Sequence, residues 1–480
     1  MVKKNSRTKR ALSKAARKEA TFARRFAWEV LEKVRERDGY VREIFNAERG
    51  KAFEKASRSE RDVCREFAFA EAVCIGVTAC LGTLDELIDR NLNSPRDVKP
   101  KLRGALRISA WEMLFAEHAD YVVVDQGVEL ARYAAPRAAG LANAVLRKMA
   151  RDAKDFPWGD SKTDAATLAR SGGMPEWLTR RLVDAYGMEA TRDMLDAMLG
   201  QAPVYLVDVP GAGRGTISGE LMPGRLLQGR GPLETAACCA EGQSRQLELV
   251  KPDGPDPRAV VSFASDAAAQ HVAGLVPLAG SVLEVGAGRG TKTALMQMRS
   301  LEERGRGADI HALDVHEFKR DVLRKRLQDL GLPPVKTYTG DGRRLDEVDG
   351  LPPAFDAVFV DAPCSGTGTF RRHPEGRWRL APKDVESLVS LQGELLASAA
   401  GRVVSGGTLV YSTCSVLPEE NEGVVRAFLG SGAGAGFAQV LLDDCFHEPN
   451  WRITRDGSFQ SLPAKGRSDG HFAAVFTRRP

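Results

Sequence analysis

The 480-residue chain contains eight cysteines, and no two of them form a C-x-x-C pair. Neither a zinc site nor a disulfide framework is therefore expected. The chain also lacks a run of about 18 apolar residues, the length that a transmembrane helix requires. Its first 20 residues carry eight Lys or Arg and one Glu, with no apolar stretch behind them, so we expect no secretory signal. These absences favour a cytoplasmic, reduced protein without a membrane segment or a metal.

Neither sign of charge is in large excess, because the formal net charge is only +5. The shares of hydrophobic (43%) and charged (28%) residues are typical of globular proteins, and the length predicts two or three domains. Basic residues nevertheless concentrate in 1–25 and in 371–379, and we expect 1–20 to be a basic disordered tail. Such concentration indicates nucleic-acid binding, although solvated surfaces have the same composition.

Apolar residues between about 21 and 151 recur at the spacing of amphipathic helices. The side chains expected to share a helix face are Phe26, Val30, Leu31 and Val34 in one segment, and Val124, Val128 and Ala131 in another. This part of the chain is therefore predicted to be an all-helical domain.

The middle of the chain is less regular. Residues 152–173 are polar and contain glycine, which predicts a linker. Residues 174–199 then supply two more amphipathic helices, and "PVYLVDVP" (203–210) predicts a short strand. We expect 174–265 to form bridging helices and a small α+β segment.

Strand-like apolar runs alternate with helical patterns in the last domain, 266–480. The expected strands are "SVLEVG", "DIHALD", "VKTYT", "FDAVFVD" and "GTLVYST". This alternation predicts an α/β domain with a Rossmann-like parallel sheet wrapped by helices. Ligands of such sheets bind beyond the carboxyl ends of the strands, where the strand order reverses.

A glycine-rich turn follows the first of these strands, in "VLEVGAGRGTKTALM" (282–296). Glycines there let the backbone approach a ligand closely, and the helix start offers unpaired N–H groups. Asp314 and Asp341 end the next two strands. A turn followed by two such acids is the arrangement that holds S-adenosylmethionine, although both acids could instead cap helices. The residues expected around the cofactor are Gly286, Ala287, Gly288, Arg289, Gly290, Thr291, Lys292, Asp314, Asp341 and Asp361.

Two cysteines, Cys364 and Cys414, each follow a strand whose carboxyl end faces the expected ligand crevice, and Asp361 precedes Cys364 by three residues. An isolated buried cysteine is usually a small hydrophobic residue. A nucleophilic thiol needs nearby positive charge or helix N-termini, because an unperturbed thiol is mostly protonated at neutral pH. The basic residues that could supply this charge, and that we also expect to bind RNA, are Arg371, Arg372 and His373.

A reaction that uses both S-adenosylmethionine and a thiol is methylation of carbon 5 of a pyrimidine. This carbon is a poor nucleophile until a thiolate adds at carbon 6. A carboxyl group such as that of Asp361 could assist the addition by interacting with ring N3. One cysteine would attack, and a second could assist release.

The motifs "DAPCSGTG" and "YSTCSVLPEENE", with "RRHPEGRW" between them, resemble those of the RNA cytosine-5 methyltransferases of the NOL/NOP/Sun group. The segment "VVVDQGVELARYAAPRAAGLANAVLRKMAR" (122–151) resembles the end of a NusB-like RNA-binding domain, which indicates the RsmB (Sun) type within this group. The resemblance implies that Cys414 is the nucleophile and that Cys364 assists product release. The turn departs from it, since "GAGRGTK" stands where the family usually has C-A-A-P-G-G-K.

The resemblance implies a monomeric enzyme with a NusB-like domain over 21–151 and RNA as its partner, most simply 16S-type ribosomal RNA. Two alternatives stay open. DNA cytosine-5 methyltransferases carry their nucleophile in a P-C motif, and a non-catalytic RNA-binding or ribosome-assembly factor would tolerate an altered cofactor turn. Cofactor binding distinguishes the second alternative from the enzyme.

Overall fold

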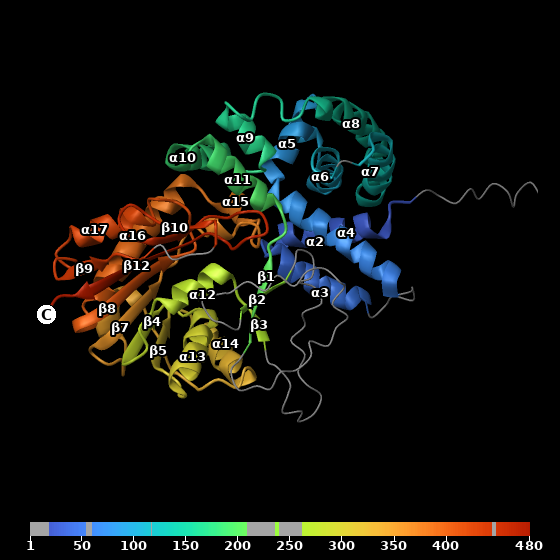
Figure 1. Cartoon of the computed structure of the whole chain (residues 1–480). Helices are drawn as coiled ribbons and strands as arrows, with labels where there is room; N and C mark the ends of the chain where they lie inside the picture. The colour runs from blue at the N-terminus through green and yellow to red at the C-terminus, as the bar shows by residue number, and fades with distance from the viewer. Residues whose placement is uncertain (1–18, 54–59, 117, 209–235, 240–261, 444–447) are drawn as a thin grey trace, which may run out of the picture. The chain divides into compact units, whose positions relative to one another are not determined.

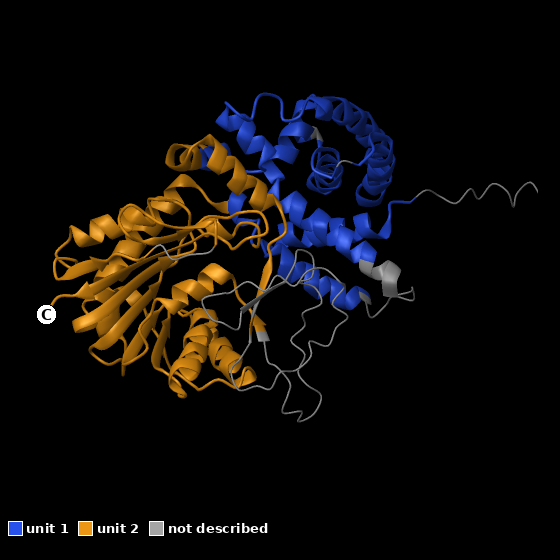
Figure 2. Ribbon diagram, viewed as in Figure 1, with its two compact units in different colours: residues 1–179, 373–378 blue, residues 180–372, 379–480 orange. Residues whose placement is uncertain are grey.

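The computed structural model describes residues 19–53, 60–116, 118–208, 236–239, 262–443 and 448–480. The chain divides into two compact units, which Figure 2 shows in different colours. Unit 1 comprises residues 1–179 and 373–378, and unit 2 comprises residues 180–372 and 379–480. The predicted tail, residues 1–20, lies outside the described residues except for its last two.

The described part of unit 1 consists of helices. They are α2 (Phe22–Arg37), α3 (Val41–Phe53), α4 (Glu60–Ala79), α5 (Leu81–Arg90), α6 (Pro100–Leu114), α7 (Asp120–Ala134), α8 (Ala139–Asp152), α9 (Ala165–Ser171), the start of α10 (Glu176–Tyr186) and most of α15 (Gly376–Arg379). Phe26 packs edge-on against Phe45 and Phe67, with ring centroids 5.6 and 5.1 Å apart. Apolar burial along these faces stabilises helices of this length more than propensity does. The predicted helical domain is confirmed.

One predicted linker contains a helix. Asp164 caps α9, because its carboxylate accepts hydrogen bonds from the backbone N–H groups of Ala166 and Thr167. Such a cap satisfies N–H groups that the first turn of a helix leaves without partners, and so stabilises a short helix. Leu168 and Ala169 are buried. The polar composition of 152–173 concealed this short apolar face.

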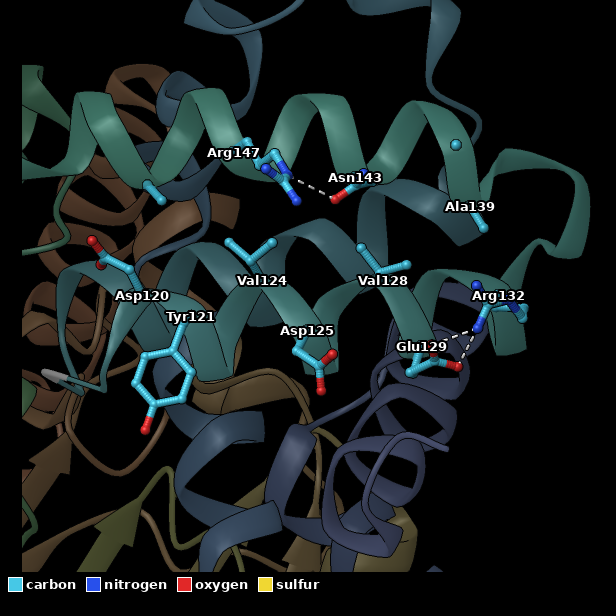
Figure 3. A pocket seen from close by; sticks show the side chains of 12 residues that line it. Asp120, Tyr121, Val124, Asp125, Val128, Glu129, Arg132, Ala139, Asn143 and Arg147 are labelled. Atoms are coloured by element: carbon cyan, nitrogen blue, oxygen red, sulfur yellow. Dashed lines mark hydrogen bonds and ion pairs between the residues drawn. The ribbon is translucent and has the colours of Figure 1, made fainter. Parts of the chain in front are cut away.

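The buried face of α7 includes only one of the three predicted residues, Ala131. Val123, Gly127 and Leu130 face the core, and a Cβ atom at Gly127 would lie 2.5 Å from Ser109 Oγ. Val124 and Val128 instead line an open groove between α7 and α8, where Figure 3 shows their side chains. Because both triplets have helical spacing, the pattern alone does not distinguish them.

Unit 2 is built on a nine-stranded sheet in the order β10-β11-β12-β8-β7-β4-β5-β6, with β9 paired to β12. Its strands are β4 (Ser281–Val285), β5 (Asp309–Asp314), β6 (Lys336–Thr339), β7 (Phe355–Asp361), β8 (Val403–Thr413), β9 (Phe437–Val440), β10 (Trp451–Ile453), β11 (Phe459–Ser461) and β12 (His471–Arg478). Strands β4 to β8 pair in parallel, whereas β12 is antiparallel to β8. The predicted Rossmann-like sheet is confirmed, and the strand order reverses at β4.

Helices cover both faces of this sheet, as Figure 1 shows. One face carries α12 (Ala267–Gly274), α13 (Thr291–Arg304) and α14 (Glu317–Asp329), and the other carries α16 (Pro382–Ala400) and α17 (Glu422–Leu429). In β4, Val282 packs into the first layer and Leu283 into the second. Alternation of side chains along a strand is what lets an almost wholly apolar strand serve two layers.

The remaining elements of unit 2 precede the large sheet in the chain. Helix α11 (Met188–Leu199) leads to a three-stranded antiparallel sheet in the order β2-β1-β3. Its strands are β1 (Val204–Asp208), β2 (Ala236–Cys239) and β3 (Ser262–Ala264). The predicted strand in 203–210 is therefore present. Residues 209–235 and 240–261 of the predicted bridging segment lie outside the described residues.

Within the described ranges no single helix is both long and apolar enough to cross a membrane. The segments Arg65–Ala79 and Leu81–Arg90 meet that criterion only as a pair, and they are bent by 79°.

Candidate active site at the ends of the parallel strands

The glycine-rich turn lies between β4 and α13, beside the end of β7. Gly286 has φ of 85°, and a Cβ atom there would lie 2.3 Å from the backbone oxygen of Asp361. Only glycine tolerates both the left-handed conformation and this approach. At Gly288 a Cβ atom would meet no heavy atom closer than 3.8 Å, so the space over the turn is open. The turn can therefore present its backbone to a ligand.

Asp314, at the end of β5, holds this turn in place. Its Oδ2 accepts a hydrogen bond from Gly288 N at 3.0 Å, and its Oδ1 accepts one from His316 N at 2.9 Å. The Lys319 ammonium lies 3.3 Å from Oδ1. The carboxylate thus fixes the turn on which the cofactor is expected, and its predicted bond to a ribose diol stays a prediction.

Asp341, at the end of β6, has a different set of partners. It caps the short 3-10 helix η4 (Gly342–Glu347), accepting from the backbone N–H of Arg343, and it pairs with the Arg343 guanidinium at 2.6 Å. These hydrogen bonds lower the pKa of Asp341 to about 2. The capping role that the sequence left open is the one that these contacts support. A cofactor contact by Asp341 stays a prediction.

The predicted cysteine pair is in direct contact. Sγ of Cys364 lies 3.1 Å from Sγ of Cys414, and it also accepts a hydrogen bond from Cys414 N at 3.2 Å. Gly368 N donates to the backbone oxygen of Cys414 at 3.0 Å, which ties the loop after β7 to the end of β8. Two thiols that are 50 residues apart in sequence therefore share one location.

An ion pair joins the turn to the cysteine loops. Lys292 Nζ lies 2.7 Å from Asp361 Oδ2, and Asp361 Oδ1 accepts a hydrogen bond from Ser412 Oγ at 3.1 Å. Lys292 was expected among the cofactor-binding residues. It pairs with the carboxylate that precedes Cys364, and its contact with the cofactor stays a prediction. The pair places one positive and one negative charge at the carboxyl ends of β4 and β7.

The two thiols differ in acidity. A hydrogen bond from the Cys364 thiol and the positive charge of Lys292 lower the pKa of Cys414, against the effect of burial. The hydrogen bond to Cys414 and burial raise the pKa of Cys364. These opposite shifts favour Cys414 over Cys364 as the thiolate.

Glu284, in β4, is fully buried, and burial raises its pKa to about 8. Its Oε2 accepts a hydrogen bond from Thr293 Oγ1 at 2.6 Å, whereas its Oε1 has no partner. An open glycine turn, a buried Asp314 carboxylate and an unpartnered carboxyl oxygen fit a ligand with hydroxyl and amino groups, as S-adenosylmethionine has. Among the described residues, no three His, Cys, Asp or Glu side chains are grouped to hold a metal ion.

The basic cluster after Cys364 is not a free surface. The Arg371 side chain is 0% exposed, and its guanidinium pairs with Asp469 and donates to the backbone oxygens of Ala464 and Arg467. Arg372 also pairs with Asp469. These contacts use the Arg371 donors inside the protein and do not support an RNA contact, which stays a prediction.

The other two predicted RNA contacts are less enclosed. The Arg372 side chain is 28% exposed and forms a second ion pair, at 3.1 Å, with Asp266. His373 is exposed and belongs to unit 1, where its ring lies 5.9 Å from the ring of Tyr40. RNA binding by Arg372 and His373 stays a prediction.

Sequence reasoning missed a polar network behind the cysteines. It consists of Ser365, Thr367, Gln392, Ser415 and Glu420. The run "PEENE" after Cys414 was visible as a motif, but nothing in the sequence paired it with Ser365, 55 residues away.

Comparisons with known proteins identify relatives of both the helical part and the sheet-containing part of the chain. Residues 278–477 match the model of the 16S rRNA methyltransferase RsmB/F family, and residues 21–151 match that of the NusB family. The ribosomal RNA small subunit methyltransferase B of Salmonella arizonae is 30% identical over 430 residues, which cover 86% of this chain and 91% of the relative.

Solved structures share the fold. The crystal structure of PH0851 superposes with a TM-score of 0.69 at 22% identity, covering 96% of this chain and 100% of that one. The structure of NSun6 from Pyrococcus horikoshii with SFG has a TM-score of 0.50 at 18% identity and covers 64% of this chain and 98% of its own. At these identities the likeness concerns the fold.

Proposed function

Because the chain belongs to the RsmB/F family of 16S rRNA methyltransferases, we propose that it methylates carbon 5 of a cytosine in small-subunit ribosomal RNA, using S-adenosylmethionine. Family membership confirms the resemblance drawn from the two cysteine motifs. The observation that carries the proposal is the contact between the Cys364 and Cys414 thiols, beside the Lys292–Asp361 ion pair.

The proposed mechanism begins at Cys414. Its thiolate adds to carbon 6 of the cytosine, forming an S–C bond and making carbon 5 electron-rich. Lys292 favours the thiolate, and the Asp361 carboxyl group is assigned to ring N3, where as a proton donor it neutralises the negative charge that the addition places on the ring. Bound S-adenosylmethionine supplies an electrophilic methyl group, and the turn of Gly286 and Gly288 with Asp314 would hold it.

Release requires two further bond changes. The proton at carbon 5 leaves to a base, and the S–C bond breaks so that Cys414 regains its electron pair. Cys364 is assigned to this stage, because its thiol already contacts the Cys414 sulfur. A proton held on Cys364 would stabilise the departing thiolate through an S–H···S hydrogen bond.

The helical part of the chain is proposed to bind the RNA. The match of residues 21–151 to the NusB family supports this role. Phosphate contacts would make the affinity for RNA fall with salt. We further propose that the protein acts as a monomer in the cytoplasm.

A methyl-transfer assay tests the proposal. The purified chain is incubated with small-subunit ribosomal RNA and S-adenosylmethionine that carries a labelled methyl group, and the product is mapped by bisulfite sequencing. Label at carbon 5 of a cytosine is expected. Absence of both cofactor binding and RNA methylation would favour a non-catalytic RNA-binding factor, and label on DNA but not on RNA would favour a DNA methyltransferase.

A further inference from the structure

Glu420 is a fully buried carboxylate at the end of the loop that follows Cys414. It accepts hydrogen bonds from four donors that carry no charge. They are Ser365 N at 2.8 Å, Ser365 Oγ, Gln392 Nε2 at 3.0 Å and Ser415 Oγ. Among the described residues no Lys, Arg or His forms an ion pair with Glu420. Burying a carboxylate is costly unless it is fully hydrogen-bonded, so its position is strongly constrained by these donors.

Three of the four donors belong to the residues that directly follow the two cysteines. Ser365 follows Cys364, and Ser415 follows Cys414, so one carboxylate is bonded to both cysteine loops. The two serine hydroxyls are themselves 3.2 Å apart. Gln392, from α16, links Glu420 to the residue that precedes Cys364. Its Nε2 donates to Glu420 and also to the backbone oxygen of Pro363 at 2.9 Å.

The backbone around Glu420 is also hydrogen-bonded to β8. The Tyr411 hydroxyl donates to the backbone oxygen of Glu420 at 2.6 Å, and the neighbouring Asn421 accepts a hydrogen bond from Thr413 Oγ1. Asn421 Nδ2 donates in turn to the backbone oxygen of Ser415 at 2.9 Å. Tyr411 and Thr413 belong to β8, so the loop that carries Glu420 is fastened to the strand that directly precedes Cys414.

We infer that Glu420 is a positioning residue that holds the Cys364 and Cys414 loops together, so that the two thiols stay in contact while one bonds to RNA and is released. The inference rests on the proposed function for its role in catalysis. The role of Glu420 in keeping the two thiols in contact can be tested without RNA. Loss of the carboxylate frees Ser365 and Ser415 to separate, which lowers the effective concentration of one thiol at the other.

The first test measures thiol contact directly. Diamide takes two electrons and two protons from the thiols of Cys364 and Cys414, forming the disulfide and the corresponding hydrazine, and peptide mass spectrometry gives the rate. Glu420→Gln and Glu420→Ala should form this disulfide at least fivefold more slowly than the unmodified chain. Glu419→Gln is the matched control, because it makes the same chemical change at the neighbouring residue, whose side chain is 45% exposed. In this variant the disulfide should form at the original rate.

The second test measures catalysis. In folded Glu420→Gln, kcat should fall at least tenfold and the covalent RNA adduct should persist longer, while the Kd for S-adenosylhomocysteine stays unchanged. A general loss of structure would weaken cofactor binding as well. If the unmodified chain does not methylate RNA but Glu420 variants still oxidise slowly, the proposed function fails and the positioning role stands.

Ser365→Ala covers the case in which Glu420 variants do not fold. It removes one hydroxyl donor and leaves the Ser365 N–H bonded to Glu420. Slower disulfide formation in folded Ser365→Ala supports the inference. Disulfide formation at the original rate in every folded variant of Glu420, or in Ser365→Ala when no Glu420 variant folds, overturns it.

Discussion

Lys292 Nζ lies 2.7 Å from Asp361 Oδ2, and this ion pair joins the first turn of α13 to the last residue of β7. The side chains are only 13% and 25% exposed, so solvent screens the pair weakly. Lys292 follows the turn proposed for the cofactor, and Asp361 precedes Cys364. The pair therefore connects the proposed cofactor site to the thiol chemistry.

The order of bond making and breaking predicts different fates for the two cysteine variants. Cys414→Ala should abolish both methyl transfer and any adduct, because no thiolate is left to add at carbon 6. Cys364→Ala should allow addition and methylation but slow release, so a denaturant-resistant adduct with RNA should accumulate. A denaturing gel of each variant with cofactor and RNA measures this. The double variant is the control and should form no adduct. An adduct in Cys414→Ala alone would reverse the two roles.

The charge on Lys292 predicts a pH shift in thiol reactivity. Lys292 lowers the pKa of Cys414, so the thiolate is populated at a lower pH than in an ordinary cysteine. Lys292→Met removes this charge and leaves Asp361 unbalanced, and both changes raise the pKa of Cys414. The pH at which iodoacetamide alkylates Cys414 half-maximally should therefore move upward, as peptide mass spectrometry can follow.

Lys336→Met provides the control for this shift, since Lys336 pairs with Asp309 at the opposite end of β5. It removes the same charge without touching the cysteine loops. An unchanged alkylation profile in folded Lys292→Met would show that Lys292 does not activate Cys414.

The contacts of Asp314 predict weaker cofactor binding when its carboxylate is removed. Asp314→Ala loses the bond that holds Gly288 and the proposed bond to the ribose diol, so binding should weaken on the order of 1.5–3 kcal/mol, or about 10- to 150-fold in Kd. Calorimetric titration with S-adenosylhomocysteine measures this. Asp341→Ala is measured in the same way. If this variant binds S-adenosylhomocysteine with unchanged affinity, Asp341 only caps its helix. Equal affinity in Asp314→Ala and the unmodified chain would remove Asp314 from the site.

The burial of Arg371 predicts a loss of stability rather than a loss of RNA contacts. Arg371→Ala leaves part of the buried Asp469 carboxylate unpaired, which should lower the free energy of unfolding by about 3–5 kcal/mol. Arg371→Lys should not restore it, because an ammonium cannot reproduce the guanidinium fork. Denaturant unfolding measures the change. Unaltered stability with reduced affinity for RNA would instead support an RNA contact.

The large elements were predictable because their signals are local. The alternation of apolar runs such as "FDAVFVD" with helical patterns predicted the parallel sheet, and β7 covers the same residues, Phe355–Asp361. The short helix α9 was missed because an apolar face of Leu168 and Ala169 is too small to stand out in a polar segment. On α7 Ala131 is buried as expected, but the spacing alone did not show that Val123 and Gly127, which packs against Ser109, are buried in place of Val124 and Val128.

The sequence by itself determined which chemistry the site could perform, because the two cysteine motifs, Asp361 and the glycine turn each lie at a strand end that local pattern predicts. The tertiary structure alone decided which of these groups touch. Three contacts join residues that are far apart in the sequence. Cys364 contacts Cys414, 50 positions away, and Lys292 pairs with Asp361, 69 positions away. Glu420 accepts a hydrogen bond from Ser365, 55 positions away. Such contacts depend on strand order, register and loop packing, and these are set by the burial of the whole sheet.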